Sequence, residues 1–340
     1  MVIRKQYPFK IFSFIYVLIL VSYCNVSLAK SDNISVSKTT YRTKKIEKDS
    51  TSKQHEKSYF GTSFSFLSNS VYNGRHDSLT TAYYTPMIGY YNKSGFYITG
   101  SLSYTHNVED NRIDLFDIST GYDFTIIPDK LTGGIYAGKS YYNKGSTSIK
   151  SDEKGSLGAN LSSDFDFITL SLGTDVIFAS KTDIRSILSL SHEFNIEGKN
   201  ASSWSLTPTA SVVMSTLNSY EGYTNRRIGK DGLKRNQNLR SKTIVTTISN
   251  QKGFTLMDYE FMLPVAYEAK TWGVSFTPQL SIPQNPIFTN TTTTYTYMRN
   301  RVPLAQTVNS TPESEKTLTP EFFVELAVHL KLFGGQLKEK

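Results

Sequence analysis

The chain has 340 residues, 38% of them hydrophobic, and a mean hydropathy of −0.33. After the N-terminus no apolar run could span a membrane as a helix, which excludes a helical membrane protein. The net charge of +8 does not indicate nucleic-acid binding. Residues 1–57 hold 11 Lys/Arg against 4 Asp/Glu, whereas the rest holds 26 against 25 and so lacks a basic surface.

Residues 1–29 have the features of a secretory signal peptide. Basic residues precede an apolar run at 11–21, and Ser27-Leu28-Ala29 offers small side chains for cleavage after Ala29. Two alternatives stay open. Cys24 could accept a lipid, although a small residue is expected before it, or the run could be a short anchor. Cys24 is the only cysteine, so cleavage would leave no disulfide and no thiolate site.

Residues 30–57 are rich in Ser, Thr and Lys and contain few apolar residues. Such a segment cannot bury enough surface to order itself, so it predicts a disordered periplasmic tail. At the other end, residues 334–340 read as a short C-terminal tail.

Between residues 58 and 333 the sequence predicts about twelve β-strands, because apolar and polar residues alternate with a period of two. The expected strands are 59–67, 80–91, 96–104, 112–126, 132–142, 156–165, 168–178, 184–194, 203–216, 257–267, 272–282 and 321–333.

The connections between these strands sort by length. Every second one is short, whereas those on the other side include four long ones. The short ones are 92–95, 127–131, 164–167, 196–200 and 268–271, and the long ones are 69–78, 143–154, 217–252 and 287–319. Short periplasmic turns and long external loops are typical of outer-membrane barrels. An antiparallel up-and-down transmembrane β-barrel is therefore predicted, with a soluble sandwich as the alternative.

The stretch 254–286 shows the pattern most clearly. One face of its first strand carries Met257 and Tyr259 with further apolar residues, and the other carries Asp258 and Glu260. Proline lacks the backbone donor that a ladder needs, so Pro264 and Pro278 predict bulges or strand ends.

The segments Asp258–Tyr267 (D-Y-E-x-x-L-P-x-x-Y) and Phe276–Pro286 (F-T-P…I-P-Q-N-P) resemble outer-membrane β-barrel proteins common in the Bacteroidota. The resemblance covers about residues 58–333 and implies fold and location, but no family activity. One departure concerns the C-terminus. Such barrels end on an aromatic residue that the barrel-assembly machinery recognises, whereas here Phe333 is followed by GGQLKEK.

Polar residues at inward positions are candidates for lining the lumen. These are Asp117, Asp123, Asp175, Asp258, Glu260, Glu325, His329 and Lys331. The carboxylates could favour cations, or they could be ion-paired inside a packed barrel. The loop at 217–252 is basic and could bind lipopolysaccharide phosphates, or it could be merely solvated. Its anion-binding candidates are Arg226, Arg227, Lys230, Lys234 and Arg235.

The sequence thus predicts a monomeric outer-membrane barrel that is structural or a passive small-solute channel, with outer-membrane lipid and lipopolysaccharide as partners. A lipid-modifying enzyme and a surface-binding barrel using the two long loops are the alternatives. For the enzyme, His106 and His192 are the histidines to weigh, but neither has a spaced nucleophile and orienting group. No catalytic residue, metal or cofactor is predicted.

Overall fold

The computed structural model describes residues 58–76, 82–106, 111–146, 148–199, 201–220, 239–248, 253–286, 288–299, 302–309, 313–314 and 318–333. The chain divides into two compact units, 1–32 and 33–340, and the first lies outside the described residues, as do the expected signal peptide and both tails. The part of the chain that the structure describes contains no helix long and apolar enough to cross a membrane.

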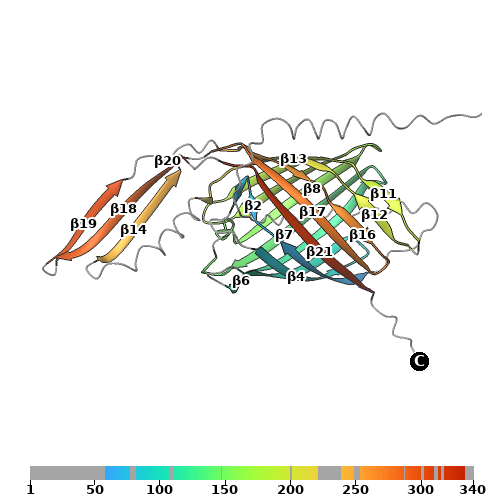
Figure 1. Ribbon diagram of the computed structural model, residues 1–340, viewed down its shortest axis with the longest axis horizontal. Coiled ribbons are helices and arrows are strands. Elements are labelled where there is room, and N and C mark those ends of the chain that lie inside the picture. The colour runs from blue at the N-terminus through green and yellow to red at the C-terminus, as the bar shows by residue number, and fades with distance from the viewer. Residues whose placement is uncertain are drawn as a thin grey trace, which may run out of the picture. The chain divides into compact units, whose positions relative to one another are not determined.

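Twelve antiparallel strands form a closed barrel (Figure 1), which confirms the predicted fold. Three of them are interrupted, so that two short strands follow one another in the same wall position. The strands are β1 (Tyr59–Leu67), β4 (Ala82–Tyr91), β5 (Phe96–His106), β6 (Asn111–Ile127), β7 (Leu131–Tyr142), β8 (Gly155–Asp164), β9 (Thr169–Phe178), β10 (Asp183–Ser191) with β11 (Phe194–Glu197), β12 (Ser203–Leu206) with β13 (Thr209–Ser215), β15 (Thr255–Met262) with β16 (Val265–Glu268), β17 (Trp272–Pro283) and β21 (Glu321–Phe333). The last strand pairs with both β17 and β1 and so closes the barrel.

The outer surface of the barrel is apolar. In β21, Leu326, Val328 and Leu330 point outward and are about 45% exposed, while Phe323 points inward and is 5% exposed. In the described residues, thirty-nine large apolar side chains are 36–70% exposed. A soluble protein does not leave so much apolar surface in water. The expected alternation therefore places an apolar band around the barrel.

The two ends of the barrel differ. One end, here called the turn end, carries the connections 92–95, 128–130, 165–168, 198–202 and 269–271, together with residues 58 and 333. The opposite end, the loop end, carries the connections 68–81, 143–154, 216–254 and 284–320, and two short ones at 107–110 and 179–182.

Three prolines lie at one height in neighbouring strands. Pro208 separates β12 from β13, and Pro264 separates β15 from β16, as the missing donor predicts. Pro278 differs from the expectation, because it stays inside β17 and pairs with Val324 of β21. The break falls in the neighbouring strand instead, between β15 and β16, where the amide of Leu263 donates to the carbonyl of Pro278 at 3.1 Å.

The alternation predicts that Met257 lies on the outward face with Tyr259, but the structure places it on the inward face. The register between β13 and β15 shifts after Val213, and Met257 points inward with 1% of its surface exposed. A bulge places two residues opposite one, so Met257 and Asp258 are both buried although they are neighbours in sequence.

The two long connections predicted as loops at 217–252 and 287–319 contain strands that pair with each other. They are β14 (Leu239–Ile248), β18 (Phe288–Arg299), β19 (Val302–Asn309) and β20 (Glu313–Ser314). β14 pairs with β18, and β18 also pairs with β19 and β20. Two insertions separated by the β15–β17 hairpin therefore build one antiparallel sheet.

Candidate functional site

The connection between β1 and β4 folds into the lumen. It forms a hairpin of two short strands, β2 (Val71–Tyr72) and β3 (Arg75–His76), and residues 69–75 are all buried. Asn73 and Gly74 have φ values of 52° and 76°, as a type I′ turn requires. A Cβ on Gly74 would lie 2.8 Å from Cβ of Pro283, so the tip of the hairpin touches the barrel wall. Residues 68–76 are called the plug hairpin below.

Arg75, next to the tip of the plug hairpin, fixes it to the wall. Its guanidinium donates hydrogen bonds to the carbonyl of Asn73 at 3.0 Å and to that of Asn285, after β17, at 2.5 Å. The same group lies 5.6 Å from the ring centre of Tyr220. A buried arginine needs such partners because an unpaired buried charge is costly.

Tyr72 fills the centre of the loop end. Its ring packs with Ile149 and Ile177, and two cations lie over it: Arg185 at 5.2 Å and Lys150 at 5.0 Å. Such cation–π contacts stabilise a neutral ring by about 0.5–2 kcal/mol each. Burial, and secondarily the negative charge of a nearby glutamate, raises the pKa of Tyr72 well above its usual value, so the phenol stays neutral.

The connection between β7 and β8 also folds inward. Ser146, Ser148 and Ile149 are buried, and Ser146 donates to the carboxylate of Asp114 at 2.7 Å. Asp114 is 1% exposed and is also paired with Arg112 at 2.8 Å. This network joins the inward segment to the wall strand β6.

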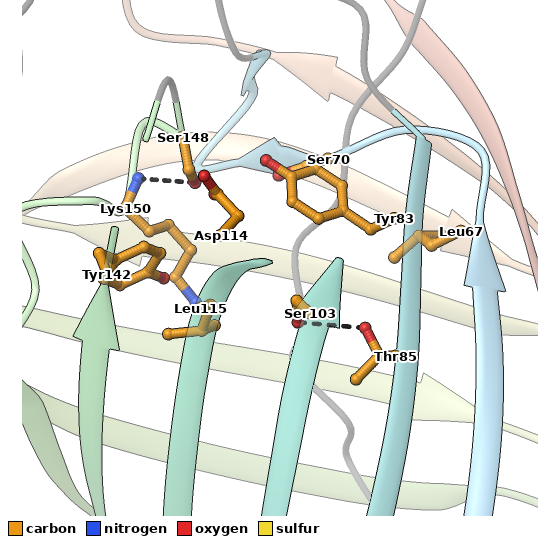
Figure 2. A pocket seen from close by; sticks show the side chains of 10 residues that line it. All are labelled: Leu67, Ser70, Tyr83, Thr85, Ser103, Asp114, Leu115, Tyr142, Ser148 and Lys150. Carbon is orange, nitrogen blue, oxygen red and sulfur yellow. Dashed lines mark hydrogen bonds between the residues drawn. The ribbon is translucent and has the colours of Figure 1, made fainter. Parts of the chain in front are cut away.

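A small polar cavity remains between these inward segments and the wall. Its volume is about 50 Å³, and Figure 2 shows the side chains around it. They are Leu67, Ser70, Tyr83, Thr85, Ser103, Asp114, Leu115, Tyr142, Ser148 and Lys150. Thr85 donates to Ser103 at 3.1 Å on the wall side. The space suits one or two waters, because a water needs about 30 Å³ and polar partners.

Asp175 lies at the centre of a buried network in the wall. Arg185 holds its carboxylate with two hydrogen bonds of 2.8 and 3.2 Å, and the hydroxyl of Tyr136 also donates to it. The network needs glycine at position 158, because a Cβ there would lie 2.5 Å from both the Asp175 carboxylate and the Tyr136 hydroxyl oxygen. Both arginine hydrogen bonds reach the same carboxylate oxygen, and such charge-assisted bonds make arginine a strong partner for a buried carboxylate.

Asp258 and Glu260 follow one another on the inward side of β15. Asp258 is fully buried and accepts a hydrogen bond of 2.6 Å from Ser281, while its other oxygen has no partner. Glu260 lies between Ser211 and Ser281 in the register. Both carboxylates therefore face serine-bearing strands.

The other predicted lumen residues are part exposed. Asp117 accepts from Ser140 at 2.7 Å and from Ser119 at 3.2 Å. His329 contacts Glu268 at 3.0 Å, and Lys331 lies 4.0 Å from the same carboxylate. Asp123 and Glu325 occupy inward register positions and are part exposed.

Burial thus divides the inward face into two halves. Side chains near the loop end are buried beneath the inward segments: Tyr83, Thr85, Ser103, Thr105, Asp114, Ile177, Asp183, Arg185, Met257, Asp258 and Phe323. Toward the turn end the corresponding side chains are part exposed, for example those of Thr99, Asp123, His329 and Lys331. Most of these inward side chains are therefore covered near the loop end and more accessible toward the turn end.

The structure brings some predicted residues together and leaves others apart. Asp175 meets Arg185, and Asp258 meets Glu260 along β15, whereas Asp117 and His329 lie elsewhere on the wall. The anion-binding candidates Arg226, Arg227, Lys230, Lys234 and Arg235 lie outside the described residues. Sequence reasoning missed the plug hairpin. The signal was Asn73-Gly74 between short runs with apolar residues, which is typical of a tight hairpin rather than an open loop.

The two histidines weighed for an enzyme lie apart. His106 ends β5 at an exposed outward position. At the turn end, a ring nitrogen of His192 contacts the carbonyl of Phe167, and its ring packs against Phe194 at 4.4 Å. No group of three or more His, Cys, Asp or Glu side chains that could hold a metal occurs in the described ranges.

No protein-family model matches the chain, and no curated protein matches it. Among solved structures, a porin is 10% identical with a TM-score of 0.27, and the match covers 81% of this chain and 99% of that one. BamA from Haemophilus ducreyi lacking POTRA domains 1–3 is 8% identical with a TM-score of 0.29, covering 80% and 70%. Pseudomonas aeruginosa OccK3 (OpdO) is 9% identical with a TM-score of 0.25, covering 81% and 95%. At this level of similarity the fold assignment rests on the barrel's own geometry.

Proposed function

We propose that the chain is an outer-membrane barrel that conducts small solutes, with a preference for cations. The apolar outer band requires lipid around it, and the sorting of turns and loops is the one that outer-membrane barrels have. The observation that carries the conduction proposal is the chemistry of the inward face. Asp117 is part exposed on that face, and its carboxylate accepts hydrogen bonds from the neutral donors Ser119 and Ser140, which leave its negative charge uncancelled.

The test is planar-bilayer recording of the protein from Lys30 onward. Asp258→Asn combined with Glu260→Gln is expected to move the reversal potential in a salt gradient toward zero, because two lumen carboxyl groups are replaced by amides. Glu193→Gln is the matched control, since Glu193 is exposed at the turn end between β10 and β11. A folded barrel that never conducts in any variant, including those described below, would overturn the channel proposal.

A surface-binding barrel is the second candidate, and one observation favours it. The two long insertions pair into the β14–β18–β19–β20 sheet, which a channel wall does not need. The basic residues that precede β14 in the sequence make anionic lipopolysaccharide the ligand to test. Arg226→Glu with Arg227→Glu is expected to weaken binding to lipopolysaccharide-containing vesicles. Equal binding by the variant and the unaltered protein would count against this function. We also propose that the barrel is a monomer, which a size measurement in detergent tests.

A further inference from the structure

We infer that the plug hairpin, residues 68–76, is a gate that closes the loop end of the lumen and opens the cation pathway when it leaves. This inference rests on the proposed channel function and adds its regulation. The hairpin occupies the half of the lumen in which most inward side chains are buried, while those in the other half are more accessible. It is therefore positioned where a moving part would control passage.

The plug hairpin is not part of the barrel ladder. β2 pairs only with β3 among the described strands, whereas β21 and β1 each pair with two neighbours. At its base, the amide of Ser68 donates to Val324 at 2.9 Å, which anchors the segment to β21. The hairpin can leave as a unit without breaking a hydrogen bond between barrel strands.

Three side chains of the hairpin, those of Val71, Tyr72 and Arg75, make prominent contacts with the surrounding wall and inward segments. Arg75 bonds to the carbonyl of Asn285, Tyr72 lies between two cations, and Val71 packs against Phe323 and Tyr83. Because each of these contacts depends on a single side chain, we expect one substitution to weaken the closed position.

The closed position also leaves polar groups unsatisfied. Both amide atoms of Asn69, which is fully buried, lack a partner, and so do the amide oxygen of Asn73 and one oxygen of Asp258. Such groups regain hydrogen bonds to water when the hairpin leaves. The closed state is thus held by apolar and cationic contacts and opposed by these groups, as a two-state element requires.

Opening would expose a polar mouth. Asp258 and Ser281 lie under the hairpin tip, and Thr85 and Ser103 lie on the opposite wall. A hydrated cation entering from the loop end would meet Asp258 first and then Glu260, one inward position further down β15.

The experiment compares three proteins in planar bilayers: the unaltered chain from Lys30 onward, Arg75→Ala, and a variant in which residues 69–75 are replaced by an equally long Gly-Ser segment. Lys93→Ala is the matched control, since it removes one cation from an exposed turn. Arg75→Ala is expected to raise the open probability by at least ~10-fold, as expected for loss of a hydrogen bond from a charged group. The Gly-Ser variant is expected to stay open, and Lys93→Ala to match the unaltered chain.

The outcomes separate the two proposals. Conduction in every protein with equal open probability would leave the channel standing and overturn the gate. Silence in every folded protein would overturn the channel and with it the gate.

A second measurement does not depend on conductance. In Val71→Cys, with Cys24 replaced by Ser in any protein that retains the leader, a membrane-impermeant maleimide should react slowly, and faster when Arg75→Ala is added. Val71 is 1% exposed in the closed state, so equal slow labelling in both backgrounds would show that the hairpin does not leave.

Discussion

Gly158 gives the sharpest prediction about the packing of the lumen. In the Gly158→Ala variant the new methyl group would lie 2.5 Å from the Tyr136 hydroxyl oxygen and 2.5 Å from an Asp175 oxygen. Ordinary van der Waals contact begins near 3.4 Å, so the tyrosine must withdraw by about 1 Å. Asp175 cannot follow freely, because Arg185 holds it with two hydrogen bonds.

The expected cost has two parts. Overpacking of a filled interior costs about 1–3 kcal/mol. Displacing Tyr136 also removes its hydrogen bond to a carboxylate, worth about 1.5–3 kcal/mol. Together they predict a loss of about 2.5–6 kcal/mol in the free energy of unfolding.

The assay is urea unfolding from lipid vesicles, followed by fluorescence of Trp204 and Trp272 and by migration of the folded band in gels. Gly100→Ala is the matched control, because a Cβ at Gly100 meets no atom within 4 Å. The control should be neutral or stabilised by up to about 1 kcal/mol, since alanine restricts the unfolded chain. If both variants unfold at the same urea concentration, the close fit of Tyr136 to Gly158 is refuted.

Three further predictions use the same preparation. Arg185→Leu should cost about 3–5 kcal/mol, because it leaves Asp175 buried without its cation, and adding Asp175→Asn should recover part of that loss in urea titrations. Val328→Lys, in the middle of an outward row, should cost about 2–4 kcal/mol, and Leu332→Lys near the turn end much less; equal costs would contradict the lipid band. Tyr72 has a raised pKa when folded, so the stability that its neutral phenol contributes is complete below the unfolded value near 10 and is lost as pH rises toward the folded value. Alkaline unfolding curves of the unaltered protein and Tyr72→Phe should therefore diverge above about pH 10, and parallel curves would place Tyr72 in water.

The barrel can be predicted from the sequence because the alternation that defines it is visible within each strand alone. A wall between lipid and a polar interior forces a period of two on each strand, and the alternation in Phe322–Leu332 or Ile168–Phe178 is visible without any partner. Turn lengths then give the orientation. The pairing of Asp175 with Arg185 follows from the same rule, because the two residues are register partners on β9 and β10 and so share the inward face.

The candidate site was predicted less well, because its geometry depends on contacts distant in sequence. The inward position of Met257 depends on a bulge opposite Val213, which no pattern in 254–286 reveals. The plug hairpin is a connection that packs inward, and only the barrel around it makes burial of Asn69–Arg75 possible. Strand pairing between 239–248 and 288–299 joins segments that each read as polar loops when taken alone.

The sheet made from the two insertions has a consequence for the order of assembly. β14 precedes the β15–β17 hairpin and β18 follows it, so neither insertion finds its partner until that hairpin is in place. Residues 239–248 must wait, as an unpaired edge strand, for a partner that is synthesised some forty positions later. A chain that ended before β18 would therefore carry β14 as an unpaired edge strand, the kind of edge that pairs with other chains.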